Sequence, residues 1–430
     1  MNRITIILLT FLCVFGIENI NAQQPDLNYF LEQAKLNSPL LQQNKANTEL
    51  IRLDLQQTER ILKSPVINLE SNVLFAPIIS HDNNTTRFEL TSPGATNYIG
   101  YDQAYTDGGQ FQAFVTLNQP LLKSSSLKAF KNKSEIADKQ NKDAIQLNIH
   151  ELEQLVGYQF VLCRKSKKKL ENLLELNAQL KEQFSTLKLL AKHAIYKQTD
   201  VMLMQLEFQN AEIQLKASEE EFNTNIYDLY LLCGIKESIN NKIEWSDIIL
   251  KPTTVTNSQF LNSYSNDSLN VITDQIISEL KYKPQLNLFA NAGMNAVYLP
   301  GFDRFGFSTG LNFSWNIFDG NQRKIEAQKS TLKLKTISFE KDHFSTQKQL
   351  NLKKIQLQIN ALDERILLSE NQLKMYTELY QAYQKQLAVG EISIMDFKIF
   401  LHDFTTKKQE KSLLDMEKQI LINAYNYWNY

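Results

Sequence analysis

The 430-residue chain contains little glycine and little proline, 13 and 9 residues respectively. Because these residues end helices and form turns, their scarcity favours long uninterrupted helices over a loop-rich fold. The formal net charge is also close to zero, at -1. No excess of positive charge suggests a nucleic-acid partner, so the composition disfavours that functional class.

Cysteine is scarce as well, with three residues in the whole chain. Cys13 lies in an apolar N-terminal run, which leaves Cys163 and Cys233 for the remainder. If the helix that holds Cys163 turns back near residue 194, Cys163 faces about residue 225, and Cys233 then lies about 8 residues, roughly 12 Å, further along. A disulfide needs α-carbons within about 7 Å, so we predict none.

Long hydrophobic runs are missing after the first residues. The N-terminus, "MNRITIILLTFLCVFGIENINAQQ", has one basic residue, an apolar run over 4–15 and a small residue at Ala22. It predicts a secretory signal peptide over 1–22, since the run is shorter than the roughly 20 residues of a membrane-spanning helix. No later segment approaches about 18 consecutive apolar residues. A membrane role would therefore have to use strands.

Four segments alternate with a period of two, which predicts strands: "VINLESNVLF", "FQAFVTLNQ", "LNLFANAGMN" and "FGFSTGLNFSWN". The last segment gathers its apolar side chains on one face: Phe305, Phe307, Leu311, Phe313 and Trp315. The opposite faces are polar and include Asn68, Glu70, Asn72, Asn287, Asn291 and Asn312. Each strand has the length that a tilted strand needs to cross a bilayer, whereas a water-soluble sheet with a buried apolar face is the alternative.

The sequence is also duplicated. "LNQPLL" (117–122) and "FSWNIF" (313–318) lie 196 residues apart, and the same offset places Asp200 on Asp396. Upstream, "KSPVINL" resembles "YKPQLNL" at an offset of 219, so the first half has 23 extra residues between its two strands. We assign these to a long polar outer loop, since the outer loops of membrane barrels vary in length.

These patterns divide the chain into a signal peptide and two repeats, each with a helix, a strand hairpin and a helical hairpin. The signal peptide is predicted at 1–22. The first repeat, 23–265, has a strand hairpin at 66–119 around the loop 76–110, a helical hairpin at 121–232 and a mixed equatorial segment at 233–265. The second repeat, 266–430, has a strand hairpin at 285–316 and a helical hairpin at 319–428.

The long helices have a heptad seam. Apolar residues spaced three and four apart run from Leu352 to Leu387, interrupted only by Ser369, and the equivalent seam of the first half runs from Leu170 to Ala194. A helix from residue 120 to about 190 is roughly 105 Å long and must project well away from any small barrel. Each helix ends at a break, for which we predict Gly390 as the stop and Ser393 and Thr199 as caps of the returning helices.

Strand number bears on assembly. Membrane strands must close into a barrel because an open edge leaves unpaired backbone groups in lipid, and four strands are fewer than the roughly eight of the smallest barrels. Protomers would therefore share one barrel. Two copies would give a barrel filled by side chains and three would leave room for a channel, so the polar inner faces favour three or more.

The predicted signal peptide, the duplicated strand and helix order, "FSWNIFDG" before a long helix and "VGEISIMDF" at its far turn resemble the TolC-like outer-membrane efflux channel family over essentially the whole mature chain. The resemblance implies an α+β membrane protein: a homotrimer with a twelve-stranded barrel in the outer membrane of a Gram-negative cell, continuous with a coiled-coil periplasmic tunnel of twelve helices. It implies a passive exit duct without catalysis, coupled through a periplasmic adaptor (membrane fusion) protein to an inner-membrane pump.

By the same resemblance, the turns of the helical hairpins would form the tunnel entrance. Gly390 and Asp396 match the family's tip pattern, Asp200 is the counterpart of Asp396, and Asp403 lies one heptad beyond it on the same face. The sequence departs from the pattern at Ile399, where some relatives have a second acid, and at Ala194, the counterpart of Gly390. The alternative for each aspartate is an ordinary exposed residue near a helix start, where acids favour the helix dipole.

Other functional classes find little support in the residues. The run "RKSKKK" (164–169) is interpreted as a solvated helix face, and the five histidines show no metal-ligand spacing. We find no phosphate loop, nucleophile elbow or supported pair of acids, and we expect no cofactor and no metal. The remaining alternative to a transport duct is a periplasmic or surface coiled-coil structural protein whose strands form a soluble sheet.

Overall fold

The structure, a computed structural model, describes residues 24–75, 78–82, 84–89, 98–99, 109–236, 243–253, 258–296 and 305–430. The predicted signal peptide, 1–22, lies outside the described residues. The chain forms two compact units, each assembled from separate stretches of sequence. The sheet unit comprises Lys45–Lys142 and Asn262–Lys341; the hairpin unit comprises the residues up to Asn44 together with Asp143–Leu261 and Asp342–Tyr430.

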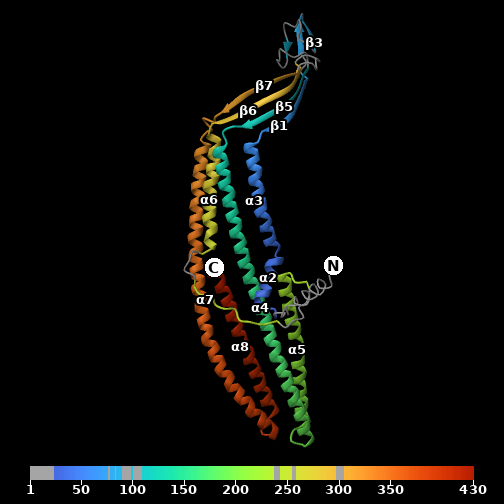
Figure 1. The fold of residues 1–430 in the computed structure, drawn as a ribbon. Coiled ribbons are helices and arrows are strands. Elements are labelled where there is room, and N and C mark those ends of the chain that lie inside the picture. Colours follow the sequence, from blue (N-terminus) through green and yellow to red (C-terminus); the bar gives the residue numbers. More distant parts are fainter. Residues whose placement is uncertain are drawn as a thin grey trace, which may run out of the picture. The chain divides into compact units, whose positions relative to one another are not determined.

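The sheet unit contains a four-stranded antiparallel sheet of β1 (Val66–Phe75), β5 (Gly109–Pro120), β6 (Gln285–Ala296) and β7 (Phe305–Ser314), in the order β1-β5-β6-β7 (Figure 1). The pairs β1 with β5 and β6 with β7 are antiparallel neighbours, and pairing between β5 and β6 joins the two halves of the duplication. The alternation of apolar and polar residues thus produces one sheet with two unlike faces.

A second, three-stranded sheet lies within the segment 76–110, for which we expected a loop. It consists of β2 (Ile78–Asp82), β3 (Thr85–Glu89) and β4 (Tyr98–Ile99), in the order β3-β2-β4. β2 and β3 form a hairpin in which Asn84 has a positive φ of 60°. An asparagine-rich turn between two runs of β-branched and aromatic residues favours such a hairpin.

Helices in the sheet unit are held together by polar contacts. They are the larger part of α3 (Pro39–Lys63), the first turns of α4 (Ser124–Lys192), most of α6 (Phe260–Glu279) with the short 3₁₀ turn Leu280–Tyr282, and the start of α7 (Gln322–Val389). Lys133 on α4 pairs with Asp274 on α6 at 2.7 Å, and Asn141 donates to the Thr48 hydroxyl of α3 at 2.8 Å. The helix α4 is therefore bound to both α3 and α6.

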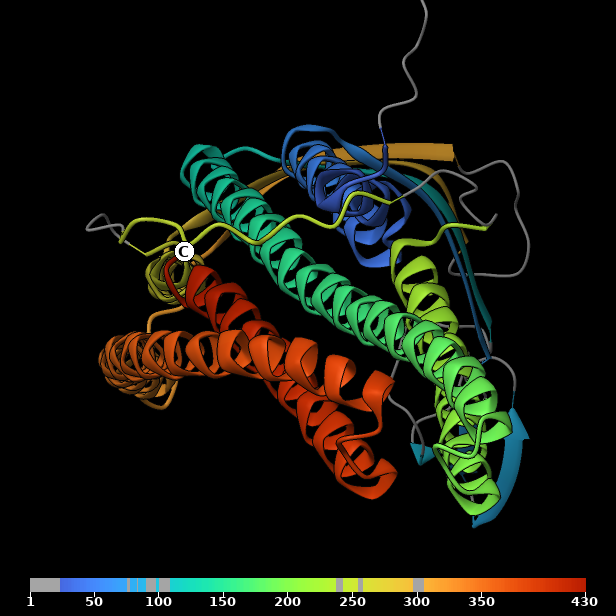
Figure 2. The ribbon, with the colours of Figure 1, turned by 90° about the horizontal axis from the view of Figure 1, so that it is seen from below.

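The hairpin unit contains two antiparallel helical hairpins. One joins α4 to α5 (Gln198–Cys233), and the other joins α7 to α8 (Ile394–Trp428) (Figure 2). The predicted seam is observed, since Ile355, Ile359, Leu362, Tyr380 and Leu387 are buried and the other seam residues of α7 are half-buried. Heptad spacing thus decides which face of each long helix is covered.

At the other end of the hairpin unit, α2 (Leu27–Asn37) packs on α4 and α5. Its Phe30 is fully buried against Phe160 and Tyr230. Cys163 and Cys233 belong to the same cluster and are free thiols, and burial raises the pKa of each to about 12. The Cys163 thiol donates to the carbonyl of Asn225 at 3.1 Å, which confirms the residue that Cys163 was predicted to face.

Candidate functional site

The turns that join α4 to α5 and α7 to α8 have the same backbone geometry. Gly390 has a φ of 79°, and Ala194, its counterpart in the duplication, has a φ of 59°. The left-handed region suits glycine because it has no Cβ, whereas alanine is strained there. Ala194 therefore adopts the same turn conformation as Gly390, but at a higher conformational energy.

The two turns contact each other directly. The Tyr196 hydroxyl lies 3.1 Å from the carbonyl oxygen of Leu387 and 3.0 Å from that of Ile392, so its proton is donated to the backbone of the opposite turn. A Cβ placed on Gly390 would lie 2.9 Å from Cγ2 of Ile195. Burial raises the pKa of Tyr196, and the nearby Asp200 carboxylate adds to this. The turn of one hairpin is thus fastened to the turn of the other.

Two of the three predicted tip aspartates, Asp200 and Asp396, are involved in helix capping. Asp396 Oδ2 accepts the Ser393 hydroxyl proton at 2.6 Å while the Asp396 amide donates back to Ser393 Oγ at 3.1 Å, so Ser393 is the cap that the sequence predicted. Asp200 Oδ2 accepts the amide of Lys197 at 3.0 Å. Lys197, rather than the predicted Thr199, is the N-cap of α5. Ser393 and Asp396 therefore bond each other reciprocally, whereas at the start of α5 the Asp200 carboxylate makes the side-chain bond, because a lysine side chain has no acceptor.

The tip residues Asp396, Ile399 and Asp403 of α8 are all exposed. Asp403 is exposed and lies two turns further along α8 than Asp396, which is also exposed, as the heptad spacing predicts. Ile399, between them in sequence, is 54% exposed. The carboxylates of Asp396 and Asp403 are therefore available on one surface of α8, with the exposed apolar side chain of Ile399 between them in sequence.

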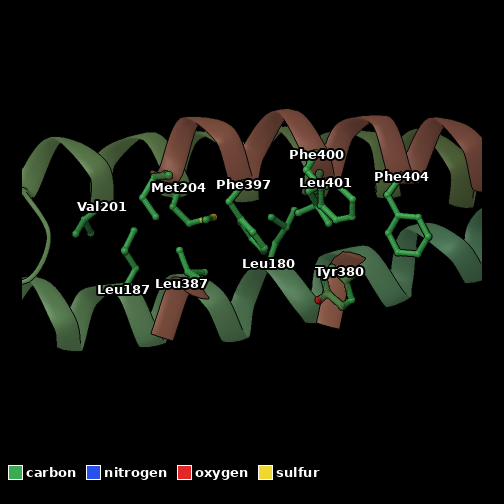
Figure 3. Packing of buried hydrophobic residues seen from close by; sticks show 12 residues of the cluster. Leu180, Leu187, Val201, Met204, Tyr380, Leu387, Phe397, Phe400, Leu401 and Phe404 are labelled. Carbon is green, nitrogen blue, oxygen red and sulfur yellow. The ribbon is translucent and has the colours of Figure 1, made fainter. Parts of the chain in front are cut away.

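An aromatic core lies behind these turns and joins the two hairpins. Phe397 is fully buried among Leu180 of α4, Met204 of α5 and Leu387 of α7, and Figure 3 shows these side chains converging between the helices. Tyr380 and Phe404 extend the core along α7 and α8, with ring centroids 5.8 Å apart. All four helices of the two hairpins therefore bury side chains in one cluster.

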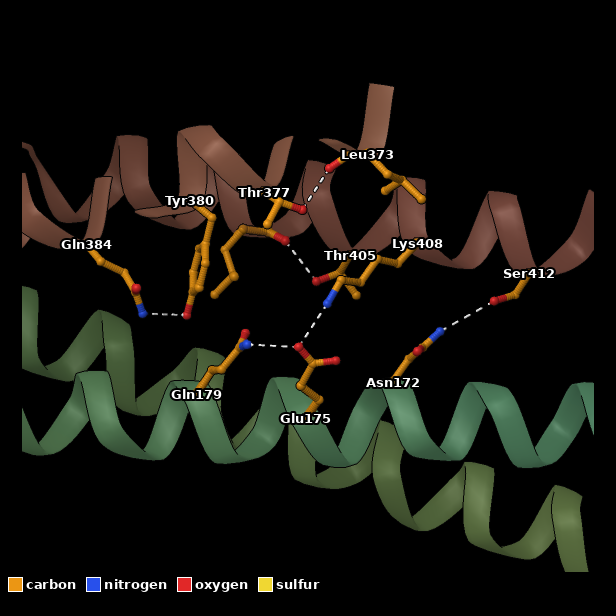
Figure 4. A network of polar contacts seen from close by, with 11 residues as sticks. Asn172, Glu175, Gln179, Leu373, Thr377, Tyr380, Gln384, Thr405, Lys408 and Ser412 are labelled. Carbon is orange, nitrogen blue, oxygen red and sulfur yellow. Dashed lines mark hydrogen bonds and ion pairs between the residues drawn. The ribbon is translucent and has the colours of Figure 1, made fainter. Parts of the chain in front are cut away.

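Polar contacts surround this core. Lys408 of α8 pairs with Glu175 of α4 at 3.0 Å, and Glu175 also accepts from Gln179 at 3.1 Å (Figure 4). Gln384 donates to the Tyr380 hydroxyl at 2.8 Å, and burial raises the pKa of Tyr380 to about 12. Lys398 of α8 pairs with Glu207 of α5 at 2.9 Å. Because exposed ion pairs contribute little, the apolar core is the stronger connection between the hairpins.

One face of the four-stranded sheet is apolar across all strands. The register aligns Leu69 with Val115, Val115 with Ala292, and Ala292 with Phe307. The predicted apolar residues Phe305, Phe307, Leu311 and Phe313 are 69%, 85%, 62% and 62% exposed. Trp315 follows the last residue of β7 and is 54% exposed. Large apolar side chains exposed on one face to this degree mark an interaction surface.

The opposite face carries the predicted polar residues in aligned rows. Asn68 lies opposite Thr116, Thr116 opposite Asn291, and Asn291 opposite Ser308, while Asn287 pairs with Asn312. Asn72 and Glu70 lie on this face of β1, and the Thr116 hydroxyl donates to Glu70 at 3.2 Å. Glu70 is the only acid that the described residues of the four strands contribute to this face.

Two aromatic residues on the polar face were not predicted. Phe114 stands opposite Gly293, and Phe289 stands opposite Gly310. A Cβ on Gly310 would lie 2.7 Å from Cζ of Phe289, so the phenyl ring lies over the glycine. Glycines opposite these aromatic residues were the signal, since an aromatic ring covers a glycine in a neighbouring strand.

Among the described residues, no three His, Cys, Asp or Glu side chains are arranged to hold a metal ion. No described helix combines the length and apolar character required to cross a bilayer.

Known protein structures resemble this chain closely in fold although not in sequence. The CmeC outer membrane channel of Campylobacter jejuni matches with a TM-score of 0.67 and 10% identity, over 94% of this chain and 85% of CmeC. VceC, an outer membrane protein of Vibrio cholerae, matches with 0.67 and 11%, over 94% and 95%. CusC, described in terms of transmembrane channel formation, matches with 0.71 and 9%, over 94% and 91%.

The chain has the fold of the TolC-like outer-membrane channels. No known family profile matches the sequence, and no curated protein sequence matches it either. The TolC-like fold covers both halves of the duplication, since 94% of the chain aligns. At about one identical residue in ten, the similarity concerns the order and geometry of the elements.

Proposed function

We propose that the chain is a passive exit duct of the outer membrane that assembles as a homotrimer. The TolC-like fold supports this function, and the exposed apolar face of the four-stranded sheet carries it. A protein in water would have to cover Phe307 and Phe313, whereas lipid tolerates them pointing outward. We infer no catalytic role and no cofactor.

The edges of the same sheet support shared closure. In the described sheet, β1 and β7 each pair on one side only. Strands with free edges in a bilayer leave backbone groups without partners, so each protomer needs neighbours for both edges. Three copies would supply twelve strands. The polar row Asn68, Thr116, Asn291 and Ser308 would then line a lumen, with Asn72, Asn287, Asn312 and Glu70.

The helices offer a surface for neighbouring protomers. Exposed apolar side chains continue along α7 outside the heptad seam: Leu350, Leu357, Leu367, Leu368 and Met375, between 60% and 66% exposed. A second copy of the chain would cover this stripe and extend the two hairpins into a closed tunnel wall. An apolar face of a helix is normally buried against another part of the protein or assembly.

The turns of the two hairpins would form the tunnel entrance. Asp396 and Asp403 would present their carboxylates there, with Asp200 on the neighbouring hairpin and Gly390 at the turn. Asp200 and Asp396 also have a structural role, because their carboxylates make capping contacts. Asp403 makes no such contact in this proposal, and its role would be ion selectivity only. The proposal includes coupling to a periplasmic adaptor and an inner-membrane pump, which the resemblance supports.

The test is isolation of the protein from an outer-membrane fraction in detergent. A duct should appear as a species near three times the 49.8 kDa chain mass, less the signal peptide, that collapses to monomer on boiling. The same preparation should form ion-conducting pores in a planar bilayer. A protein released without detergent as a monomer or dimer would contradict the proposal and favour a coiled-coil structural role.

A further inference from the structure

At one end of the four-stranded sheet, all four strands connect to helices. The register aligns Val66, the first residue of β1, with Asn118 near the end of β5, and aligns Gln285 with Ser314 at the end of β7. The starts of β1 and β6 and the ends of β5 and β7 therefore lie at the same end of the sheet. We use the name collar for the residues beside this end: 59–65, 121–128, 279–284 and 315–324.

The collar is strongly positive although the whole chain has a net charge of -1. It contains eight basic residues: Arg60, Lys63, Lys123, Lys128, Lys281, Lys283, Arg323 and Lys324. Its three acids are Glu59, Glu279 and Asp319. The collar thus concentrates positive charge at one level of the sheet unit, while the polar face of the neighbouring strands carries a single acid among its described residues.

The three acids of the collar already have partners. Glu59 pairs with Lys131 at 3.1 Å, Glu279 pairs with Arg323, and Asp319 accepts the backbone amide of Arg323 at 2.8 Å. Lys281, Lys283 and Lys324 are exposed and form no ion pair with the described residues. Three lysines without an ion-pair partner among the described residues are therefore left on the surface of the collar, and Glu326, which pairs with Lys329, is an acid near Lys281.

Exposed apolar side chains lie at the same level. Trp315, Ile317 and Phe318 are 54%, 83% and 82% exposed, and Leu121 and Leu122 add to them on the first half of the duplication. The Trp315 indole donates to the carbonyl of Tyr282 at 3.2 Å. Aromatic residues next to basic ones are typical of the boundary between lipid chains and headgroups.

We propose that the collar binds the headgroups of anionic phospholipids in the membrane leaflet at this end of the strands. Trp315, Ile317 and Phe318 insert at the level where acyl chains meet headgroups, and Lys281, Lys283 and Lys324 contact the phosphates. The basic side chains favour an anionic occupant, and the exposed apolar side chains beside them favour a lipid over a small soluble anion. The inference rests on the proposed function, since it requires the strands to lie in a membrane.

The test compares phosphatidylglycerol with phosphatidylcholine of identical acyl chains, titrated into the detergent-solubilised protein and followed by native mass spectrometry. Removing a basic residue near an anionic surface is expected to weaken binding on the order of fivefold. The variant K281Q/K283Q/K324Q should therefore lose the preference for phosphatidylglycerol. Raising the salt concentration should weaken binding of phosphatidylglycerol to the unchanged protein.

A matched control has the same charge change away from the collar. Lys139, Lys333 and Lys335 are exposed lysines on α4 and α7 without ion pairs among the described residues, and each lies at least about 13 Å further along its helix. The variant K139Q/K333Q/K335Q should keep the preference. Equal binding of the two lipids by the unchanged protein, or an equal loss in both variants, would overturn the inference.

Oligomeric state separates this inference from the proposed function. Heat-modifiable trimers that conduct ions but bind the two lipids equally would leave the duct standing and remove the lipid site. Trp315 gives a second readout, because phosphatidylglycerol with brominated acyl chains should quench its fluorescence. That quenching should disappear in W315F, whose remaining tryptophans, Trp245 and Trp428, belong to the hairpin unit. Quenching that is unchanged in W315F would contradict the placement of Trp315 at the lipid boundary.

Discussion

At the scale of single residues, the duplication provides pairs that occupy equivalent positions with different side chains. Gly390 and Ala194 are such a pair, since both have a positive φ, at 79° and 59°. Both turns have the same backbone conformation, so glycine and alanine differ there in the conformational energy needed to adopt it. It also gives each substitution an internal control.

Gly390→Ala should destabilise the tip by about 1–2 kcal/mol, because alanine is strained at positive φ and its Cβ would press on Ile195. Ala194→Gly should change stability by less than about 0.5 kcal/mol, since relief of strain and added freedom of the unfolded chain oppose each other. Thermal unfolding and hydrogen exchange of the turn amides measure both. Equal effects of the two substitutions would show that φ does not control these turns.

Glu153 gives a prediction for pH. His150, whose Nδ1 lies 3.9 Å from the carboxylate, and the Lys35 ammonium at 2.9 Å lower the pKa of Glu153 to about 2 from its ordinary value of 4.5. A depressed folded-state pKa means that the stabilisation is complete above pH 4.5 and is lost as the pH falls toward 2.

Glu153→Gln should therefore lower the melting temperature at pH 7 and make little difference near pH 2. Glu151→Gln, on the exposed side of the same helix turn, is the control. A stability difference between Glu153→Gln and the unchanged protein that stays constant over this pH range would contradict the assignment.

At the scale of elements, the sequence predicted what short-range periodicity specifies. A period of two gave the four long strands, and heptad spacing gave the buried seam of α7, because each pattern decides a face by itself. The sequence did not predict the three-stranded sheet within 76–110, where the strands are only two to five residues long. It also predicted Thr199 as a cap where Lys197 is one, since Asp200 bonds the backbone and leaves no need for a capping hydroxyl.

The seam gives a prediction about the helical hairpins. Leu387→Ala should destabilise the protein by about 2–5 kcal/mol, because Leu387 is 1% exposed and contributes to the aromatic core that joins α4, α5, α7 and α8. Leu379→Ala, at a position 45% exposed on the same helix, should change stability by less than about 0.5 kcal/mol. Chemical unfolding of the detergent-solubilised protein compares them. A larger effect at Leu379 would place the buried seam on another face.

At the scale of the whole molecule, the roles of the candidate site residues depend on neighbours that one chain does not contain. The alternation predicted which residues share a face of the sheet, and the register shows Asn291 beside Ser308 and Ala292 beside Phe307. In the proposed trimer, whether a face meets lipid or a lumen depends on closure between copies, which the alternation within one strand does not specify. The same holds for Asp396 and Asp403, whose exposure is a property of the single chain.

Adjacent residues with opposite orientations test the assignment of the faces. Phe307→Lys should prevent formation of the heat-modifiable trimer, because a lysine facing lipid near the bilayer midplane costs about 2–4 kcal/mol. Ser308→Lys adds the same charge to the opposite face and should leave the trimer intact while reducing its conductance for cations. Gel mobility with and without boiling, followed by bilayer recordings, measures both. Tolerance of lysine at 307 together with failure at 308 would reverse the two faces.

The buried cysteines have a practical consequence for labelling chemistry. Cys163 and Cys233 are 0% exposed, and burial raises the pKa of both thiols to about 12, so neither supplies an accessible thiolate to a maleimide or a spin label near neutral pH. Cys13 lies in the segment predicted to be cleaved. The natural sequence is therefore a ready background in which one cysteine, introduced for example at the exposed position Glu391, can be labelled selectively and used to measure distances between the tips of neighbouring copies.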